Sequence, residues 1–317
     1  MKKLFALLFC LAAASAQAQA FPEREVKIVT GFPPGSVAEL SLRALVRSAQ
    51  KFVDKPLIIV NKPGAGQSIA MNELMAAPAD GHTLGMVTDT FMGMTYYQYK
   101  LRYEADEIQP VVGYAQLRHL LFVKGDSPLK RYEDFVAQAK RQSVSYGGTG
   151  VGTTPDMLGK IWARASGLKL DYVAFKGSNE YIPSVMGGHV TSGIVDISGV
   201  AKQLEDGSLA GVVVFGNERF PEFPNIPTAA EKGVNVDMSM FNAVITIVAN
   251  RKAPADRTRV LQDAFTKAAQ DPDYRAAIKA SGMHAVVVAP EQIRTRIEAA
   301  RKLSIPLMKE MNLLQAN

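Results

Sequence analysis

The stretch Val26-Lys27-Ile28-Val29-Thr30-Gly31-Phe32-Pro33-Pro34-Gly35-Ser36 decides the fold, because it ends a β-branched run in a Gly/Pro loop. Residues 26–30 predict a buried parallel strand, and residues 37 to about 52 carry apolar side chains at helical spacing. Backbone N–H groups at the start of a helix lack intrahelical partners, and the helix dipole favours an anion there. In an open α/β sheet such a corner is where ligands bind. The stretch therefore indicates either a ligand-binding corner or an ordinary βα turn.

Strands and helical runs alternate along the rest of the chain, which predicts βαβ units and parallel sheets. A second strand is expected at residues 56–60 and a third at 83–87, each ending in a loop rich in Gly, Ser or Thr. A second α/β series runs from residue 132 to 215, and Phe241 to Ala249 reads as a long strand that carries the chain back. About 300 residues fit two domains of typical size. The pattern predicts an α/β fold with two domains.

The first twenty residues have the features of a secretory signal peptide. Lys2 and Lys3 precede an apolar run at residues 4–14 that is too short to span a bilayer, and small residues offer a cleavage site near Ala20. The only cysteine, Cys10, lies inside this segment, so the mature chain has no disulfide. An exported chain without disulfides suits a bacterial periplasm.

The charge pattern argues against nucleic acid as a partner. The formal net charge of +6 falls to +4 when the two N-terminal lysines are removed (6 minus 2), and the excess is spread along the chain. A nucleic-acid-binding protein carries a basic block or an aromatic-interleaved basic stripe, and neither occurs.

No motif for a metal, a cofactor or a catalytic centre is complete. The histidines are isolated from one another, no Gly-Lys-Ser/Thr phosphate loop occurs, and Ser36 has no G-x-S-x-G surroundings. The run from Gly148 to Gly152 resembles a dinucleotide fingerprint but lacks its G-x-G-x-x-G spacing. We therefore expect no cofactor, no metal and no catalytic residue. The histidines are His82, His119, His189 and His284.

The strongest chemical feature is the run from Gly147 to Thr154, which has four glycines and three threonines before a proline-started helix. Such a loop lets the backbone approach a ligand closely and offers N–H and hydroxyl donors to a carboxylate. Phe32 and Phe175 each stand at a predicted strand end beside a loop glycine, where a ring can either wall a pocket or pack in the core.

Together these motifs resemble one family, the periplasmic solute receptors of tripartite tricarboxylate transporters, called the Bug or TctC family. The Asn-Lys-Pro-Gly-Ala-Gly and the proline-rich stretches are specific to it, and the matches keep the family's order from Phe21 to the C-terminus. The matching stretches are residues 29–35, 60–66, 77–84, 150–153, 175–178, 187–190 and 223–233.

The resemblance implies a type II periplasmic binding protein fold, with two α/β domains joined by crossing strands and a ligand cleft between them. It implies domain 1 at residues 21–121 and 242–317 and domain 2 at residues 122–241. The implied function is capture of a small carboxylate-type organic ligand for the membrane permease subunits of the transporter, by a monomer without catalytic activity. A ligand-sensing receptor for a signalling partner and an exported α/β hydrolase are the alternatives.

Carried over position by position, the family's site implies ligand contacts from both domains, with Asp196 where the family has a polar residue able to meet a ligand group. The expected ligand-binding residues are Phe32, Pro33, Gly35, Ser36, Thr88, Thr90, Thr149, Gly150, Gly152, Thr153, Thr154, Phe175, Lys176, Gly177 and Asp196.

Three departures from the family pattern bear on the ligand. The first loop has Ser36 in place of a glycine and Glu39 after the position of the usual aspartate, Asp156 replaces a histidine in the second loop, and Thr191 replaces an acid. If Glu39 and Asp156 both face the cleft, they repel a dianion. This reading favours a monoacid, a zwitterion or a less charged aromatic acid.

Overall fold

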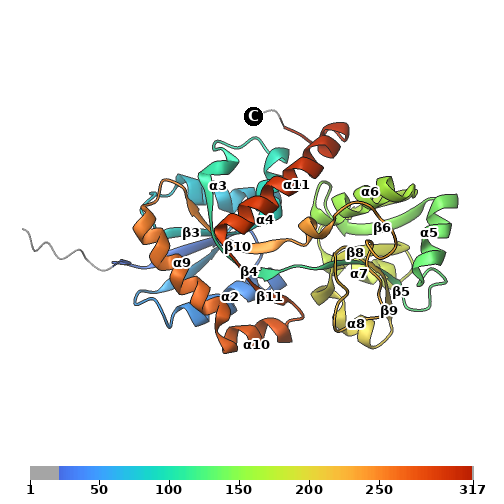
Figure 1. The fold of residues 1–317 in the computed structure, drawn as a ribbon, viewed down its shortest axis with the longest axis horizontal. Helices are drawn as coiled ribbons and strands as arrows, with labels where there is room; N and C mark the ends of the chain where they lie inside the picture. The colour runs from blue at the N-terminus through green and yellow to red at the C-terminus, as the bar shows by residue number, and fades with distance from the viewer. Residues whose placement is uncertain (1–20, 316–317) are drawn as a thin grey trace, which may run out of the picture.

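Two β-sheets organise the chain, one in each of two domains, in the computed structural model, which describes residues 21–315 (Figure 1). The predicted signal peptide, with Cys10 and the cleavage site near Ala20, lies outside the described residues. Within residues 21–315, no helix combines the length and the apolar character needed to cross a bilayer.

The first domain has a six-stranded sheet in the order β11-β4-β10-β3-β1-β2. Its parallel part is the predicted one, in which β1 lies between β2 and β3. The predicted parallel sheet is a mixed one in the structure, because β10 runs antiparallel to both β3 and β4, and β11 antiparallel to β4. The strands are β1 (Val26–Thr30), β2 (Leu57–Asn61), β3 (Thr83–Thr88), β4 (Ile108–Gln116), β10 (Val244–Asn250) and β11 (His284–Val288).

Helices cover both faces of this sheet, as Figure 1 shows. Helices α2, α9 and α10 pack on one face through a core that includes Leu42, Leu45 and Phe265, and α3, α4 and α11 pack on the other through Met71, Phe91 and Ile297. They are α2 (Val37–Ala49), α3 (Ser68–Ala76), α4 (Asp89–Gly93), α9 (Ala255–Gln270), α10 (Pro272–Ala280) and α11 (Pro290–Glu310), with the short 3-10 turns η1 (Ala65–Gln67), η2 (Thr95–Gln98) and η3 (Ala105–Glu107).

The second domain has a five-stranded sheet in the order β7-β6-β8-β5-β9, with β5 antiparallel to both neighbours. Its two cores are centred on Trp162 and on Tyr181. The strands are β5 (His119–Lys124), β6 (Val144–Thr149), β7 (Leu170–Phe175), β8 (Ser192–Asp196) and β9 (Leu209–Val214). The helices are α5 (Tyr132–Arg141), α6 (Thr154–Ser166), α7 (Ser178–Met186) and α8 (Ala201–Glu205), with η4 (Ile197–Gly199) and η5 (Ser239–Phe241).

Two chain segments cross between the domains and lie side by side. The chain changes sheets between Gln116 and His119, and it returns to the first sheet just before Val244. The Leu117 N–H donates to the Ala243 carbonyl at 2.8 Å, which joins the two crossings. The domain boundaries at residues 121 and 241 stay predictions; the first falls inside β5.

The C-terminal helix α11 also contacts both domains (Figure 1). Ile293 and Ile297 near its start belong to a core of the first domain, whereas Met308 near its end belongs to the Trp162 core. An ion pair of 2.5 Å between Arg164 of α6 and Glu310 of α11 adds to this contact. Two crossings and one helix therefore connect the two domains, and a hydrogen bond from Gln98 to the Gly152 carbonyl adds a further contact.

Candidate ligand-binding site

A cavity of about 280 Å³ lies between the ends of the two sheets and has 17 lining residues. The first domain contributes Phe32, Gly66, Gln67, Thr88, Thr90 and Thr95, and the crossings contribute Leu117 and Ala243. The second domain contributes His119, Thr149, Thr153, Thr154, Pro155, Ser178, Tyr181, Val195 and Asp196. Seven predicted ligand-binding residues meet in this lining: Phe32, Thr88, Thr90, Thr149, Thr153, Thr154 and Asp196.

On the first-domain wall, Gln67 and Thr88 hold each other in place. The Gln67 side chain accepts from the Thr88 N–H at 3.1 Å and donates to the Thr88 hydroxyl oxygen at 3.2 Å. The Thr90 hydroxyl donates to the same oxygen at 3.1 Å. A Cβ on Gly31 would stand 2.6 Å from the Gln67 Cα, so only glycine lets the β1 loop approach this closely. These hydrogen bonds and this close approach hold the wall's side chains in place.

The rest of the β1 loop supports α2 and lies outside the cavity lining. Ser36 caps α2 by accepting from the Glu39 N–H, and Gly35 has a φ of +78° and donates its N–H to the Glu39 carboxylate at 3.0 Å. Glu39 is fully buried and pairs with Arg43 at 2.6 Å. It therefore does not face the cleft, and the repulsion expected from it does not arise. Pro33 is exposed beside this loop.

On the second-domain wall, the first turn of α6 meets the cavity. Thr153 is the N-cap of α6, and Thr154 and Pro155 open the helix beside it. The glycine-rich run starts as strand, because Gly147, Gly148 and Thr149 belong to β6, so the loop is shorter than the sequence indicates. A helix of 13 residues thus directs the positive end of its dipole toward the cavity.

Gly150 and Gly152 shape this loop without lining the cavity. The Gly150 carbonyl accepts from the Tyr172 hydroxyl at 2.6 Å and from the Thr153 hydroxyl at 2.9 Å. The Gly152 N–H donates to Asp156 at 2.7 Å, and its carbonyl accepts from Gln98 of the first domain at 2.6 Å.

Asp156, like Glu39, is turned away from the cleft. It is fully buried and pairs with Lys160 at 2.7 Å, so the second half of the expected repulsion is also absent. The condition that Glu39 and Asp156 both face the cleft is therefore not met.

After β7, the residues that line the cavity come later in the chain than the three predicted ones, Phe175, Lys176 and Gly177. Phe175 packs on Tyr181 with ring centroids 6.0 Å apart, Lys176 is exposed, and Gly177 is the N-cap of α7. Ser178, the first residue of α7, and Tyr181 line the cavity in their place. The ring of Phe175 therefore supports the wall from behind.

Asp196 and His119 are adjacent at the floor of the cavity, because they are paired residues of antiparallel β8 and β5. Asp196 accepts from the Arg118 N–H at 2.5 Å, the Ser198 N–H at 3.0 Å and the Ser198 hydroxyl. Burial nevertheless raises the pKa of Asp196 to about 6. His119 is 5% exposed, and burial lowers the pKa of its imidazole to about 4.

A family model described as tripartite tricarboxylate transporter family receptor, TctC, matches residues 42–313. This chain belongs to the TctC receptor family. A relative from Cupriavidus necator, "UPF0065 protein in gbd 5'region", is 31% identical over 274 residues, which are 84% of this chain and 82% of the relative.

Two solved structures are similar to this TctC receptor throughout. An R. palustris protein with adipate gives a TM-score of 0.79 at 21% identity, covering 92% of this chain and 98% of that one. MatC from Rhodopseudomonas palustris with bound malate gives 0.71 at 24% identity, covering 93% and 100%. The likeness shows that the receptor has the two-domain fold of periplasmic binding proteins, as the sequence predicts.

Ten lining residues of the receptor were not expected from the sequence. Gln67 had a detectable signal, because it stands in the Gly-rich loop before α3, whereas Leu117, His119 and Ala243 come together only through the pairing of the crossings and of β5 with β8. The ten are Gly66, Gln67, Thr95, Leu117, His119, Pro155, Ser178, Tyr181, Val195 and Ala243.

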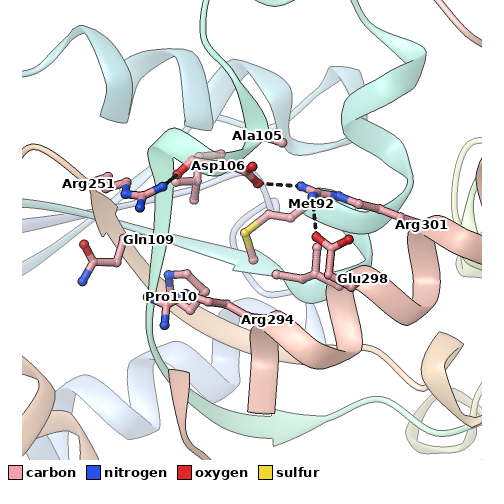
Figure 2. Close-up of a pocket in the computed structure, with 11 residues that line it drawn as sticks. Met92, Ala105, Asp106, Gln109, Pro110, Arg251, Arg294, Glu298 and Arg301 are labelled. Carbon is pink, nitrogen blue, oxygen red and sulfur yellow. Dashed lines mark hydrogen bonds and ion pairs between the residues drawn. The ribbon is translucent and has the colours of Figure 1, made fainter. Parts of the chain in front are cut away.

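A second pocket, of about 310 Å³, lies on the first domain of the receptor between α11, η3 and β4 (Figure 2). Figure 2 shows Arg301 between Asp106 and Glu298, and its ion pairs with them measure 3.0 and 2.6 Å. The positive charge of Arg301 in this pocket is therefore already paired with two carboxylates of the protein. Within residues 21–315, no group of three or more His, Cys, Asp or Glu side chains could hold a metal ion.

Proposed function

We propose that this TctC receptor captures a small organic acid in the cavity between its domains and presents it to the membrane permease of a tripartite tricarboxylate-type transporter. The supporting observation is the cavity itself, because both domains line it with hydroxyl groups and two helices of the second domain, α6 and α7, begin at it. In this proposal the receptor acts in the periplasm as a monomer, after removal of residues 1–20, and changes no bond of its ligand.

A carboxylate suits this cavity because hydrogen-bond donors and helix dipoles surround it. Thr153 and Thr154 offer hydroxyls at the start of α6, and Ser178 offers one at the start of α7. Each helix N-terminus carries about half a positive charge. The lining contains no Lys or Arg, so dipoles, hydroxyls and ordered water would hold the anion. The adipate and malate in the two similar structures support a carboxylate ligand.

The volume and the position of the cavity fit capture by domain closure. Its 280 Å³ is near the lower end of the roughly 300–1,000 Å³ of small-molecule pockets, so it suits a compact ligand. A ligand that contacts both walls stabilises the arrangement in which the walls are close, and the paired crossings allow a hinge between the domains.

Thermal unfolding of the chain from residue 21, with a panel of carboxylates, amino acids and uncharged solutes, tests the proposal. A true ligand at a hundredfold excess over Kd adds about 2.7 kcal/mol of stability and raises the unfolding midpoint by a few degrees. The compound should be recovered unchanged. Midpoints that no carboxylate raises would contradict the proposal, and a chemically altered compound would favour an enzyme.

A variant pair localises the binding. Thr154→Val removes one hydroxyl from the cavity lining, so we expect it to weaken the ligand several-fold. Thr191→Val removes a hydroxyl that accepts from Ser145 at 3.1 Å, outside the lining, and should leave the affinity unchanged. Equal effects of the two substitutions would place the ligand elsewhere.

A further inference from the structure

The cavity combines features that suit an anion with a carboxylate of its own. Among its 17 lining residues there is one acid, Asp196, and there is no lysine or arginine. A ligand that is only an anion would meet this charge in a lining that has no cationic side chain. Asp196 therefore needs an explanation beyond the binding of a carboxylate.

A comparison with three other acids shows how unusual Asp196 is. Glu39 pairs with Arg43 at 2.6 Å, Asp156 with Lys160 at 2.7 Å, and Asp89 with Arg296 at 2.6 Å. These three acids are buried near the starts of α2, α6 and α4. The structure gives Asp196 only neutral donors, from Arg118 N–H and from Ser198, with no ion pair to any residue within 21–315. The Arg118 guanidinium lies 3.6 Å from Glu222, and its charge also lowers the pKa of Asp196, although burial outweighs this effect.

His119 supplies a second acceptor beside this carboxylate. It faces Asp196 across the β5–β8 pair and is 5% exposed, and its ring has the Asn242 side chain as a hydrogen-bond partner. Burial lowers the pKa of His119 to about 4, so the imidazole is neutral near pH 7. A neutral imidazole that donates one N–H to Asn242 has its other ring nitrogen left to accept a hydrogen bond. A carboxylate and a neutral imidazole side by side require a donor-rich group, and an ammonium has three donors and the missing positive charge.

We propose that the ligand is a zwitterion, a small amino acid or short aminoalkanoate, and that Asp196 with His119 forms the subsite for its ammonium group. This inference rests on the proposed capture of a carboxylate. The ligand's carboxylate lies toward the hydroxyls of Thr153 and Thr154, and its ammonium lies at the β5 and β8 ends of the same cavity. Asp196 and His119 are then specificity-determining residues.

Isothermal titration with matched ligand pairs tests the subsite on the chain from residue 21. Each pair differs only in the amine: leucine with 4-methylpentanoate, 4-aminobutyrate with butyrate, and 5-aminopentanoate with pentanoate. In at least one pair we expect the amine to bind tenfold or more tightly. Binding of plain carboxylates without a preference for any amine overturns the subsite and leaves the proposed function standing. No binding of any panel compound overturns both.

Substitution of Asp196 assigns the preference to this residue. Asp196→Asn should remove at least tenfold of the preference for the amine while leaving the plain acid as tightly bound or tighter. The matched control is Asp206→Asn, because Asp206 accepts from the Ser208 N–H at 2.9 Å as Asp196 accepts from Ser198, but outside the cavity lining. An equal loss for both members of a pair overturns the assignment to Asp196. If Asp196→Asn does not fold, His119→Leu should reduce the preference several-fold, and an unchanged preference there overturns the subsite.

Discussion

The corner at Gly35 in the first domain and the corner at Gly152 in the second are built on one plan. In each, a glycine with positive φ donates its N–H to an acid four residues later, and that acid pairs with a base four residues further on. The corners differ in what surrounds them. The second corner has Tyr172 and Gln98 bound to its carbonyls, and Gln98 comes from the other domain.

The same arrangement of glycine, acid and base can therefore serve two purposes, to start a helix or to line the cavity and contact the other domain. The Gly35 corner starts α2 and gives the cavity one residue, Phe32, whereas the Gly152 corner gives it Thr153, Thr154 and Pro155 and also joins the domains. The buried acid is an internal clamp in both.

Removal of the clamps should have the largest effect. Asp156→Ala leaves the buried Gly152 N–H without its acceptor and Lys160, 31% exposed, without its counter-charge, so we expect a loss of about 2–4 kcal/mol in urea denaturation. Glu39→Ala should lose about 1–2 kcal/mol, because Arg43 is 52% exposed and can turn to water. The control Asp134→Ala, in an exposed pair, should lose less than about 0.5 kcal/mol. A larger loss for Glu39→Ala would reverse the ranking of the corners.

The pH dependence of stability tests the burial of His119 at the start of β5 in the second domain. The folded-state pKa of His119 is about 4, below its ordinary value of 6.5, so the unfolded chain binds a proton first as the pH falls. His119 therefore contributes stability above pH 6.5 that is lost as the pH falls toward 4. His119→Gln should remove about 2–3 kcal/mol of this acid-induced loss, as measured by urea denaturation between pH 7 and pH 4. A constant difference between variant and wild type across that range would contradict the assignment.

Alanine at the two glycines separates backbone strain from contact between the domains. In Gly35→Ala the new Cβ meets open space, so only the φ of +78° is unfavourable. We expect this substitution to lower the free energy of unfolding by about 1 kcal/mol. Gly152→Ala has a similar φ of +74°, but its Cβ would stand 2.2 Å from Gln98 Oε1, so it should lose about 2 kcal/mol. Equal losses in urea denaturation would mean that Gln98 moves aside without consequence.

Gln98→Ala should have the smallest effect and isolates the contact itself. It removes the 2.6 Å hydrogen bond to the Gly152 carbonyl, worth about 0.5–1.5 kcal/mol. In a double-mutant cycle it should add little to Gly152→Ala, because both remove the same contact. The control Asn217→Ala removes a hydrogen bond to Ser239 away from the glycine-rich loop and should be additive with Gly152→Ala. Full additivity of Gln98→Ala would show that the two residues are independent.

Periodicity was enough to predict most of the fold. Buried faces leave a pattern in the local sequence, either a β-branched run or apolar residues at helical spacing. Such patterns identify β1, β2 and β3 and the helices α2, α6 and α9. The five-residue elements α4 and β11 were not predicted, because α4 is too short to show a helical period and β11 follows a glycine turn without a clear alternation. The antiparallel direction of β10 depends on where the chain returns from the second domain.

The sequence predicts which loops form the site, but not which side chains of those loops face the cavity. Thr88, Thr149 and Thr153 follow strands whose ends meet by topology, so their positions in sequence point to the cleft. The side-chain directions of Glu39 and Asp156 do not follow from that topology. Arg43 and Lys160, one helical turn further on, are the signal that these acids point along their own helices. The His119 and Asp196 pair depends on strand register, which single-sequence patterns do not contain.

Helix α11 is a mechanical link between the two domains that contains a weak point. Pro306 lies inside it, where Leu303, Leu307 and Met308 pack on the Trp162 core, and a proline takes away the N–H that would bond to the carbonyl four residues earlier. The helix is therefore least stiff near Pro306, where it enters the Trp162 core. A swing of one domain relative to the other can be absorbed as bending at this point, so neither end of the helix has to leave its core.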